Sequence, residues 1–236
     1  MLKGANIRVG VRAVRAVVRR RDAPGCPDVD ASALLLARDG KVRTDDDFVF
    51  YNQPRHPSGL VRHRAKQRFG PEVTDSLDVD LGALPPGVER VVIAASVAES
   101  SFGRVPGLRV LLYDLATVGM PGTQPLARFD LVDANAETAL LCGELYRRDG
   151  GWKFRAIGQG YASGLVGLAT DFGITVEEDE DPVGGAPVAS EAASAVGVPA
   201  GGAAGAALGG AAGLAGPTVP AATPVLPLQG PQFMPR

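Results

Sequence analysis

Two groups of aspartate flank a short apolar run and are the first candidates for chemistry. Asp28 and Asp30 stand at its start, and the acidic triplet of residues 45–47 follows it. Calcium takes about six to eight oxygen ligands, several of them carboxylates. Residues two apart on a strand point to the same face, so Asp28 and Asp30 could approach one ion together. Aspartates are also ordinary turn residues, and the spacing alone favours turns.

A second candidate is the basic segment VRHRAKQRFG, which the sequence predicts to be a loop. Its cations are Arg62, Arg64, Lys66 and Arg68. Such a cluster can bind phosphate, a nucleotide or an acidic partner. The competing interpretation is a solvated loop that pairs with Asp75, Asp78 or the acidic run at Glu177, and it is favoured. If this segment has a binding function, the sequence predicts an anion-binding patch.

Little in the sequence supports catalysis. His56 and His63 lie in adjoining loop sequence without a serine or cysteine in a recognised arrangement. Cys26 and Cys142 are far apart and form no CxxC pair, which argues against a zinc site or a disulfide framework. The sequence therefore predicts a non-enzymatic protein in a reducing cytoplasm.

Charge and hydropathy exclude several classes of partner. The chain of 236 residues carries 24 basic and 26 acidic side chains, a net charge of -2. That balance gives no global attraction to nucleic acid or to a membrane. Arginines interrupt the apolar residues at the N-terminus where a secretory signal needs a continuous apolar core, and no run approaches the length of a membrane span. No nucleic-acid partner and no membrane span are expected.

Composition divides the chain near residue 178. After the acidic run of residues 177–181, the sequence consists almost wholly of Ala, Gly, Pro and Val. Such a segment cannot offset the entropy of ordering itself. We expect a folded domain over residues 1–178 and a disordered tail over residues 179–236. A docking motif in VLPLQGPQFMPR remains an alternative to plain linker.

The elements that position these side chains read as short strands between turn signals. Alternating apolar and polar residues predict strands throughout the first three quarters of the chain, with the clearest hairpin at Asp149-Gly150-Gly151. Asp39-Gly40 predicts another tight turn. Only residues 162–173 have apolar spacing typical of a helix. Strands without intervening helices predict an all-β fold, an antiparallel two-sheet β-sandwich with one or two short helices.

The arginine-rich strand over residues 8–18 and its continuation need separate interpretation. Alternation with Val and Ala predicts the wet face of an edge strand, where charge prevents edge pairing. Nucleic-acid binding is the less favoured alternative because no aromatic residues are interleaved. The arginines concerned are Arg12, Arg15, Arg19, Arg20 and Arg21.

Four segments resemble the TerD family of bacterial stress and tellurium-resistance proteins. They occur in family order over roughly residues 2–176: LKGAN, DVDASALLL with DGKV, DDFVFYNQP, and GELYRRDGGWKFRAIGQGYASGL. The resemblance implies a calcium-binding β-sandwich in a tellurite or stress response, with a poorly defined biochemical activity.

The sequence departs from the family where calcium ligands are expected. His63 matches a family histidine, but Lys66 stands at the position of an aspartate in the acidic glycine-rich loop. A second acidic segment retains only Glu99. At about 5 Å and an effective dielectric near 20, one cation repels a divalent ion by about 7 kcal/mol. Calcium (Ca2+) binding is therefore predicted to be weak or absent, with Asp28, Asp30, Asp75 and Glu99 as remnants of the site.

The functional prediction is a binding or scaffold component of a bacterial stress or tellurite-resistance system. Its partners would be proteins of that system, and the sequence leaves their identity and the oligomeric state open. The alternative is a calcium-dependent switch or a metal-dependent enzyme that uses the Asp28 and Asp30 end of the sandwich.

Overall fold

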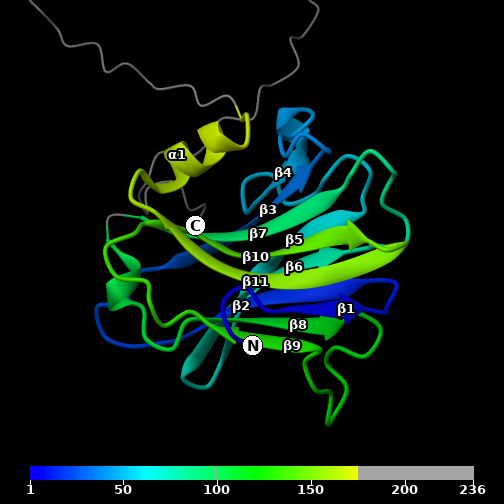
Figure 1. The fold of residues 1–236 in the computed structure, drawn as a ribbon. Coiled ribbons are helices and arrows are strands. Elements are labelled where there is room, and N and C mark those ends of the chain that lie inside the picture. The colour runs from blue at the N-terminus through cyan, green and yellow to red at the C-terminus, as the bar shows by residue number, and fades with distance from the viewer. Residues whose placement is uncertain (99, 175–236) are drawn as a thin grey trace, which may run out of the picture. The chain divides into compact units, whose positions relative to one another are not determined.

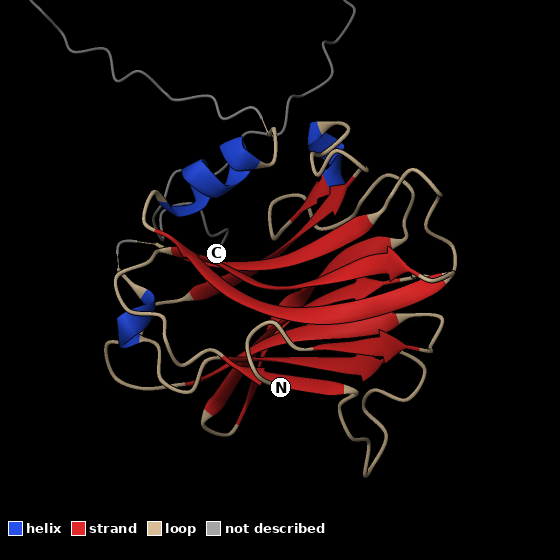
Figure 2. Cartoon of the chain, viewed as in Figure 1, coloured by secondary structure: helices blue, strands red, loops and turns tan. Residues whose placement is uncertain are grey.

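The computed structural model describes residues 1–98 and 100–174, and these form two antiparallel sheets packed face to face (Figures 1 and 2). The strand order of the six-stranded sheet is β1-β11-β10-β7-β3-β4, and that of the five-stranded sheet is β5-β6-β2-β8-β9. The predicted antiparallel β-sandwich is confirmed. The proposed boundary at residue 178 and the tail beyond it lie outside the described residues.

Each strand is short, as the sequence predicts. The six-stranded sheet contains β1 (Asn6–Val9), β3 (Val29–Leu36), β4 (Phe48–Val49), β7 (Arg90–Val97), β10 (Ala139–Arg148) and β11 (Gly151–Tyr161). The five-stranded sheet contains β2 (Val14–Arg21), β5 (Val61–Phe69), β6 (Glu72–Val79), β8 (Arg109–Asp114) and β9 (Ala127–Asp130). Short 3-10 helices span Asp45–Asp47 and Phe102–Arg104, and α1 spans Gly164–Asp171.

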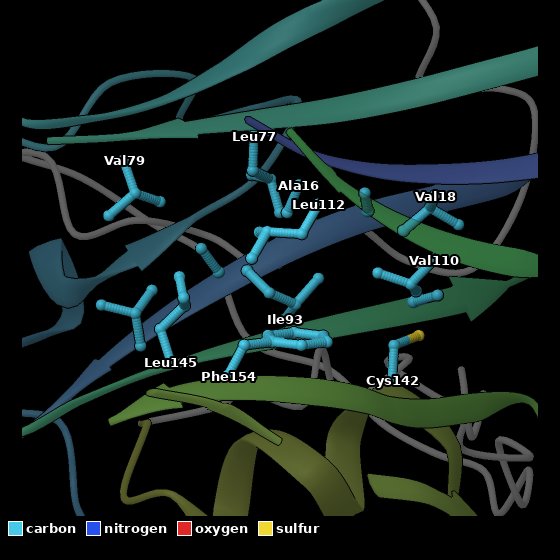
Figure 3. Packing of buried hydrophobic residues seen from close by; sticks show 14 of the residues in the cluster. Ala16, Val18, Leu77, Val79, Ile93, Val110, Leu112, Cys142, Leu145 and Phe154 are labelled. Atoms are coloured by element: carbon cyan, nitrogen blue, oxygen red, sulfur yellow. The ribbon is translucent and has the colours of Figure 1, made fainter. Parts of the chain in front are cut away.

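The main core lies between the two sheets (Figure 3). Ala16 and Val18 of β2 face Ile93 of β7 and Phe154 of β11, and all four are almost fully buried. Cys142 of β10 is a buried apolar member of this core. Alternate residues of every strand enter the core because side chains on a strand alternate between its two faces. This burial is the main source of the fold's stability.

A smaller core covers part of the outer surface of the six-stranded sheet. Leu168 and Ala169 of α1 pack with Leu34 and Leu36 of β3 and Phe48 of β4. The helix predicted over residues 162–173 is thereby confirmed, and Gly173 at its end adopts a φ of 82°. None of the helices in the described ranges is long and apolar enough to cross a membrane.

The β10–β11 hairpin closes as its turn sequence predicts. Asp149 and Gly150 adopt φ values of 53° and 70°, which are the left-handed values that a two-residue hairpin turn requires. On the paired strands, Glu144 Oε1 lies 2.5 Å from Arg155 Nη2, so the one buried carboxylate of β10 has a counterion.

Two sequence predictions about basic segments are wrong. The arginine-rich stretch does not form an edge strand: β1 and β2 are separate strands, and β2 lies between β6 and β8 at the centre of its sheet. Carboxylates on β6 make this placement stable, since Asp78 and Glu72 pair with Arg15 and Arg19. The predicted basic loop is instead β5, an edge strand paired to β6.

Candidate cation site

A bulge in β5 decides which of its cations enters the sandwich. Arg64 pairs with Ser76 and Gln67 with Thr74, so three steps along β5 match two along β6. One extra residue reverses the alternation of side chains beyond it. Arg62 and Arg64 consequently point outward, whereas Lys66 turns toward the other sheet. In a regular strand all three would share one face.

Lys66 lies between the two aspartates that the sequence singled out. Its Nζ atom is 2.5 Å from Asp28 Oδ2 and 2.6 Å from Asp30 Oδ1. Asp28 directly precedes β3 and Asp30 is its second residue, so a cation from the five-stranded sheet reaches carboxylates of the six-stranded one. Only 23% of the Lys66 side chain is exposed. The ammonium group is thus placed where a bound cation would contact both carboxylates.

Arg20 supplies a second positive charge from β2. Its Nη2 atom lies 3.3 Å from Asp28 Oδ1, and its Nη1 atom lies 3.4 Å from both Asp22 Oδ1 and the Sγ atom of Cys26. Arg20 is only 5% exposed, which the predicted wet strand face did not anticipate. Asp22 also pairs with Arg68. We use the name lysine cluster for four residues: Lys66, Arg20, Asp28 and Asp30.

Asp75 is buried beside the lysine cluster, but both of its carboxylate oxygens accept hydrogen bonds from other groups. Oδ2 accepts a hydrogen bond from the Ala31 backbone N–H at 2.8 Å, and Oδ1 accepts one from the Ser76 N–H at 2.9 Å. The Nε2 atom of His63 lies 2.7 Å from Oδ1. Asp75 therefore joins β6 to β3. His63 is a partner of this carboxylate inside a strand and not a loop residue.

Burial and neighbouring charges shift the pKa values of the lysine cluster in opposite directions. Burial works to lower the pKa of Lys66, but Asp30 and Asp28 outweigh it and raise that pKa above 10.5. Burial also opposes ionisation of Asp28, yet hydrogen bonds from Lys66 and Arg20 hold its pKa below 3.8. Asp30 is more deeply enclosed, and burial raises its pKa despite Lys66. Asp28 is therefore the firmly ionised carboxylate of the pair.

The residues present do not fit a calcium ion. Calcium needs about six to eight oxygen ligands with an excess of negative charge, and here an ammonium group contacts both carboxylates. Within residues 1–98 and 100–174, no three His, Cys, Asp or Glu side chains converge as a metal-binding group. Asp75 is engaged elsewhere, and the fourth candidate, Glu99, lies outside the described residues.

The acidic triplet of residues 45–47 forms a different cluster. Asp47 Oδ1 lies 2.5 Å from Arg43 Nη2, its Oδ2 accepts hydrogen bonds from the Arg43 backbone N–H and Nε, and His56 Nε2 lies 3.0 Å from Oδ1. Burial opposes ionisation of Asp47, but these contacts hold its pKa below 3.8. Asp47 is thus committed to Arg43 and His56, and not to the lysine cluster.

An Asp47–His56–Ser58 array continues from this contact, and sequence reasoning missed it. Ser58 Oγ lies 2.7 Å from His56 Nδ1. The Ser58 backbone N–H also donates to Nδ1, and Ser58 Oγ accepts a hydrogen bond from the Leu60 N–H. The contacts between residues 56 and 60 are therefore those of a tight turn. The sequence signal was HPSG, a histidine and a serine two residues apart.

The predicted anion-binding residues do not form one patch. Arg62 donates to the Gly59 carbonyl and Arg64 lies 3.8 Å from Asp78, both on the outer side of β5. Lys66 belongs to the lysine cluster, and Arg68 pairs with Asp22. Of the partners that the sequence suggested, Asp78 lies beside Arg64, whereas Lys66 and Arg68 pair with other aspartates. Glu177 lies outside the described residues.

Comparison with known proteins adds a family and close relatives. The model of the TerD domain family matches residues 1–172. The chain is 43% identical over 155 residues to a tellurium resistance protein TerD of Serratia marcescens, covering 62% of this chain and 78% of that protein. It is 38% identical over 157 residues to general stress protein 16U of Bacillus subtilis (strain 168), covering 63% and 79%.

A solved structure has the same fold. The crystal structure of a homologue of telluride resistance protein (TerD) from Streptomyces coelicolor A3(2) superposes with a TM-score of 0.54. It is 23% identical in sequence, and the match covers 68% of this chain and 96% of that one. At this identity the likeness concerns the fold.

Proposed function

Because the chain belongs to the TerD domain family, we propose that it acts in tolerance of tellurium compounds or related stress as a non-enzymatic binding protein that needs no calcium. One observation carries the calcium part of the proposal: Lys66 Nζ contacts both Asp28 and Asp30. Its partners would be proteins of the same stress response, and the protein would serve them as a scaffold.

The lysine cluster supports independence from calcium on electrostatic grounds. An entering ion would have to displace the Lys66 ammonium group, which is tethered to β5 and would remain near. At about 5 Å and an effective dielectric near 20, that cation repels a divalent ion by about 7 kcal/mol. Arg20 adds further repulsion from within the sandwich. Lys66 instead supplies a permanent cation that neutralises the aspartates.

The Asp47–His56–Ser58 array supports a structural role more than a catalytic one. A serine nucleophile needs a histidine base that an unencumbered carboxylate polarises. Here Arg43 contacts both oxygens of Asp47 and offsets its charge. In catalysis Nδ1 of His56 would have to accept the proton of the Ser58 hydroxyl. The Ser58 backbone N–H already donates a hydrogen bond to this atom. These contacts fix the turn after β4.

Calcium titration of the full chain tests the proposal. We expect no heat of binding up to about 1 mM calcium and no change in melting temperature with a chelator, since a ligand that does not bind the native state cannot stabilise it. Lys66→Asp replaces the ammonium with a third carboxylate, so we expect this variant to melt at a higher temperature with calcium than with chelator. Lys66→Met, which adds no carboxylate, is the matched control and should respond less.

Micromolar calcium binding by the unchanged chain would favour the calcium-dependent switch. The stress role is tested separately by growth on potassium tellurite of cells that lack or carry the intact gene. Equal survival of both strains under tellurite and under other chemical stresses would contradict that role.

A further inference from the structure

The outer surface of the five-stranded sheet is strongly basic. Pairing registers place alternate residues of each strand on this side, away from the core. Arg62 and Arg64 join the same surface because they lie opposite Asp78 and Ser76 of β6, and the bulge that follows them turns Lys66 away from it. The outer arginine face consists of Arg15, Arg19, Arg21, Arg62, Arg64, Arg109 and Arg128.

The outer arginine face carries an excess of positive charge in an acidic chain. The carboxylates that share it are Glu72, Asp78 and Asp130, so seven cations face three anions and the excess is four. The whole chain has a net charge of -2. Such a local concentration of one sign attracts a partner of the opposite sign.

The charges on the outer arginine face are arranged in two zones. At the centre, Arg15 lies 2.5 Å from Asp78 and Arg19 lies 2.7 Å from Glu72, so these cations are largely neutralised. At the edges the cations are more accessible: the side chains of Arg64 and Arg128 are 53% and 59% exposed. Arg128 also pairs with Asp130 at 2.8 Å. A partner would therefore meet exposed cations on β5 and would compete with Asp130 for Arg128 on β9, on either side of the neutralised centre.

A groove lined by both apolar and polar side chains opens in that centre. It has a volume of about 310 Å³, with Val17 and Leu111 at its floor and Tyr113 among its lining residues. Phe69 and Met120 also line it and are 55% and 59% exposed, although both are large apolar side chains. The described part of the chain places α1 on the other sheet and no helix here. Exposed apolar side chains beside a groove are typical of a protein interaction site.

We propose that the outer arginine face docks an extended acidic segment of a partner protein, with one apolar side chain of that segment in the groove. The proposal rests on the binding role proposed above and gives that role a surface and a partner chemistry. Carboxylates of the segment would pair with Arg62, Arg64 and Arg128. An apolar side chain between them would cover Phe69 and Met120.

The pattern of charge favours a polypeptide over a nucleic acid. A nucleic-acid backbone carries a negative charge at every nucleotide, and it would meet Glu72, Asp78 and Asp130 among the arginines. A peptide can place a neutral or apolar side chain opposite each of these carboxylates. The groove is also lined by Val17, Leu111 and Met120, which suit an aliphatic side chain better than a stacked base.

Binding of a designed probe to the full-length protein tests the proposal. The probe is a fluorescent peptide of about eight residues with alternating glutamates and a central leucine. We expect saturable binding that weakens at least about tenfold between low and moderate salt, because the contacts are largely between exposed charges. Replacing the leucine of the probe by serine should also weaken binding, since the groove would lose its occupant.

Variants locate the binding to this face. Arg62→Glu combined with Arg64→Glu should weaken binding at least about tenfold and leave the melting temperature nearly unchanged, because both side chains are exposed. Arg38→Glu combined with Arg148→Glu makes the same charge change at exposed positions elsewhere and should bind the probe almost as well as the unchanged protein. Equal losses in both double variants would overturn the proposal.

Two further results would also overturn it. One is the absence of binding by the unchanged protein, and the other is tighter binding of a single-stranded oligonucleotide of the same charge, which would identify a nucleic-acid surface. Neither result bears on calcium titration or on tellurite survival. Failure of the docking proposal is therefore distinguishable from failure of the proposed function.

Discussion

Asp47 and the Asp28–Asp30 pair are each held by two basic side chains, yet the two clusters are assembled differently. The partners of Asp47 are Arg43 and His56, which lie within nine residues of it in the sequence. The lysine cluster instead joins β3 of one sheet to β2 and β5 of the other. The first cluster shapes one connection, whereas the second fastens two sheets. Similar sets of acidic and basic side chains therefore stabilise a single connection in one region and the packing of the two sheets in the other.

The largest expected effect is the loss of Lys66. Removing one partner of a buried ion pair costs about 3–5 kcal/mol, but here the cluster is partly exposed, so we expect Lys66→Met to lower the free energy of unfolding by about 2 kcal/mol. Urea denaturation at neutral pH measures this loss. The double variant Lys66→Met with Asp30→Asn removes one charge of each sign and should recover part of it. If the double variant is less stable than the single one, packing and not charge explains the loss.

A second prediction concerns the pH dependence of that loss. Without Lys66 the folded-state pKa of Asp30, which burial already raises, rises further. A raised carboxyl pKa gives stability that is present at low pH and is lost as the pH rises through the folded pKa. The stability gap between the intact protein and Lys66→Met should therefore narrow as the pH falls from 7 to 4.5. A gap that is constant with pH would show that the carboxylates do not titrate differently in the variant.

A smaller loss is expected at the local cluster. Asp47→Asn keeps the shape of the side chain but turns one of its two acceptor oxygens into an NH2 donor, which then faces donors of Arg43 or His56. The Arg43 side chain is 36% exposed and can be hydrated instead, so we expect a cost of about 1 kcal/mol. The same urea denaturation measures it, and hydrogen exchange should report loosening only near the connection after β4. A cost larger than that of Lys66→Met would reverse the comparison between the two clusters.

Sequence patterns predicted the sandwich because alternation and turn chemistry are local. Gly40 and Gly150 adopt the positive φ values that their turns require, and the helix predicted over residues 162–173 is found as α1. The edge position of the arginine strand was predicted wrongly because the counterions of Arg15 and Arg19 come from β6, far along the chain. Local charge cannot reveal which neighbour will neutralise it.

The lysine cluster could be predicted only in part. The aspartates at positions 28 and 30 were recognised as a pair, and Lys66 was recognised as an unfavourable neighbour for a divalent ion. Its direct contact with both carboxylates depends on one extra residue between Arg64 and Gln67, and bulges of this kind leave no clear mark in sequence alternation. Arg20 was missed for a related reason, since an inward-facing arginine departs from the usual pattern of burial.

The smallest effect is expected at Ser58, at the end of the local cluster. Ser58 is exposed, and its hydroxyl contacts only His56 and the Leu60 N–H in a turn whose backbone hydrogen bonds remain without it. Ser58→Ala should therefore change the free energy of unfolding by at most about 0.5 kcal/mol, as is usual for exposed substitutions. Neither the intact protein nor the variant should hydrolyse p-nitrophenyl acetate faster than free imidazole at an equal concentration. A burst of nitrophenol that Ser58→Ala abolishes would show that the array has a reactive hydroxyl. The local cluster would then be catalytic as well as structural.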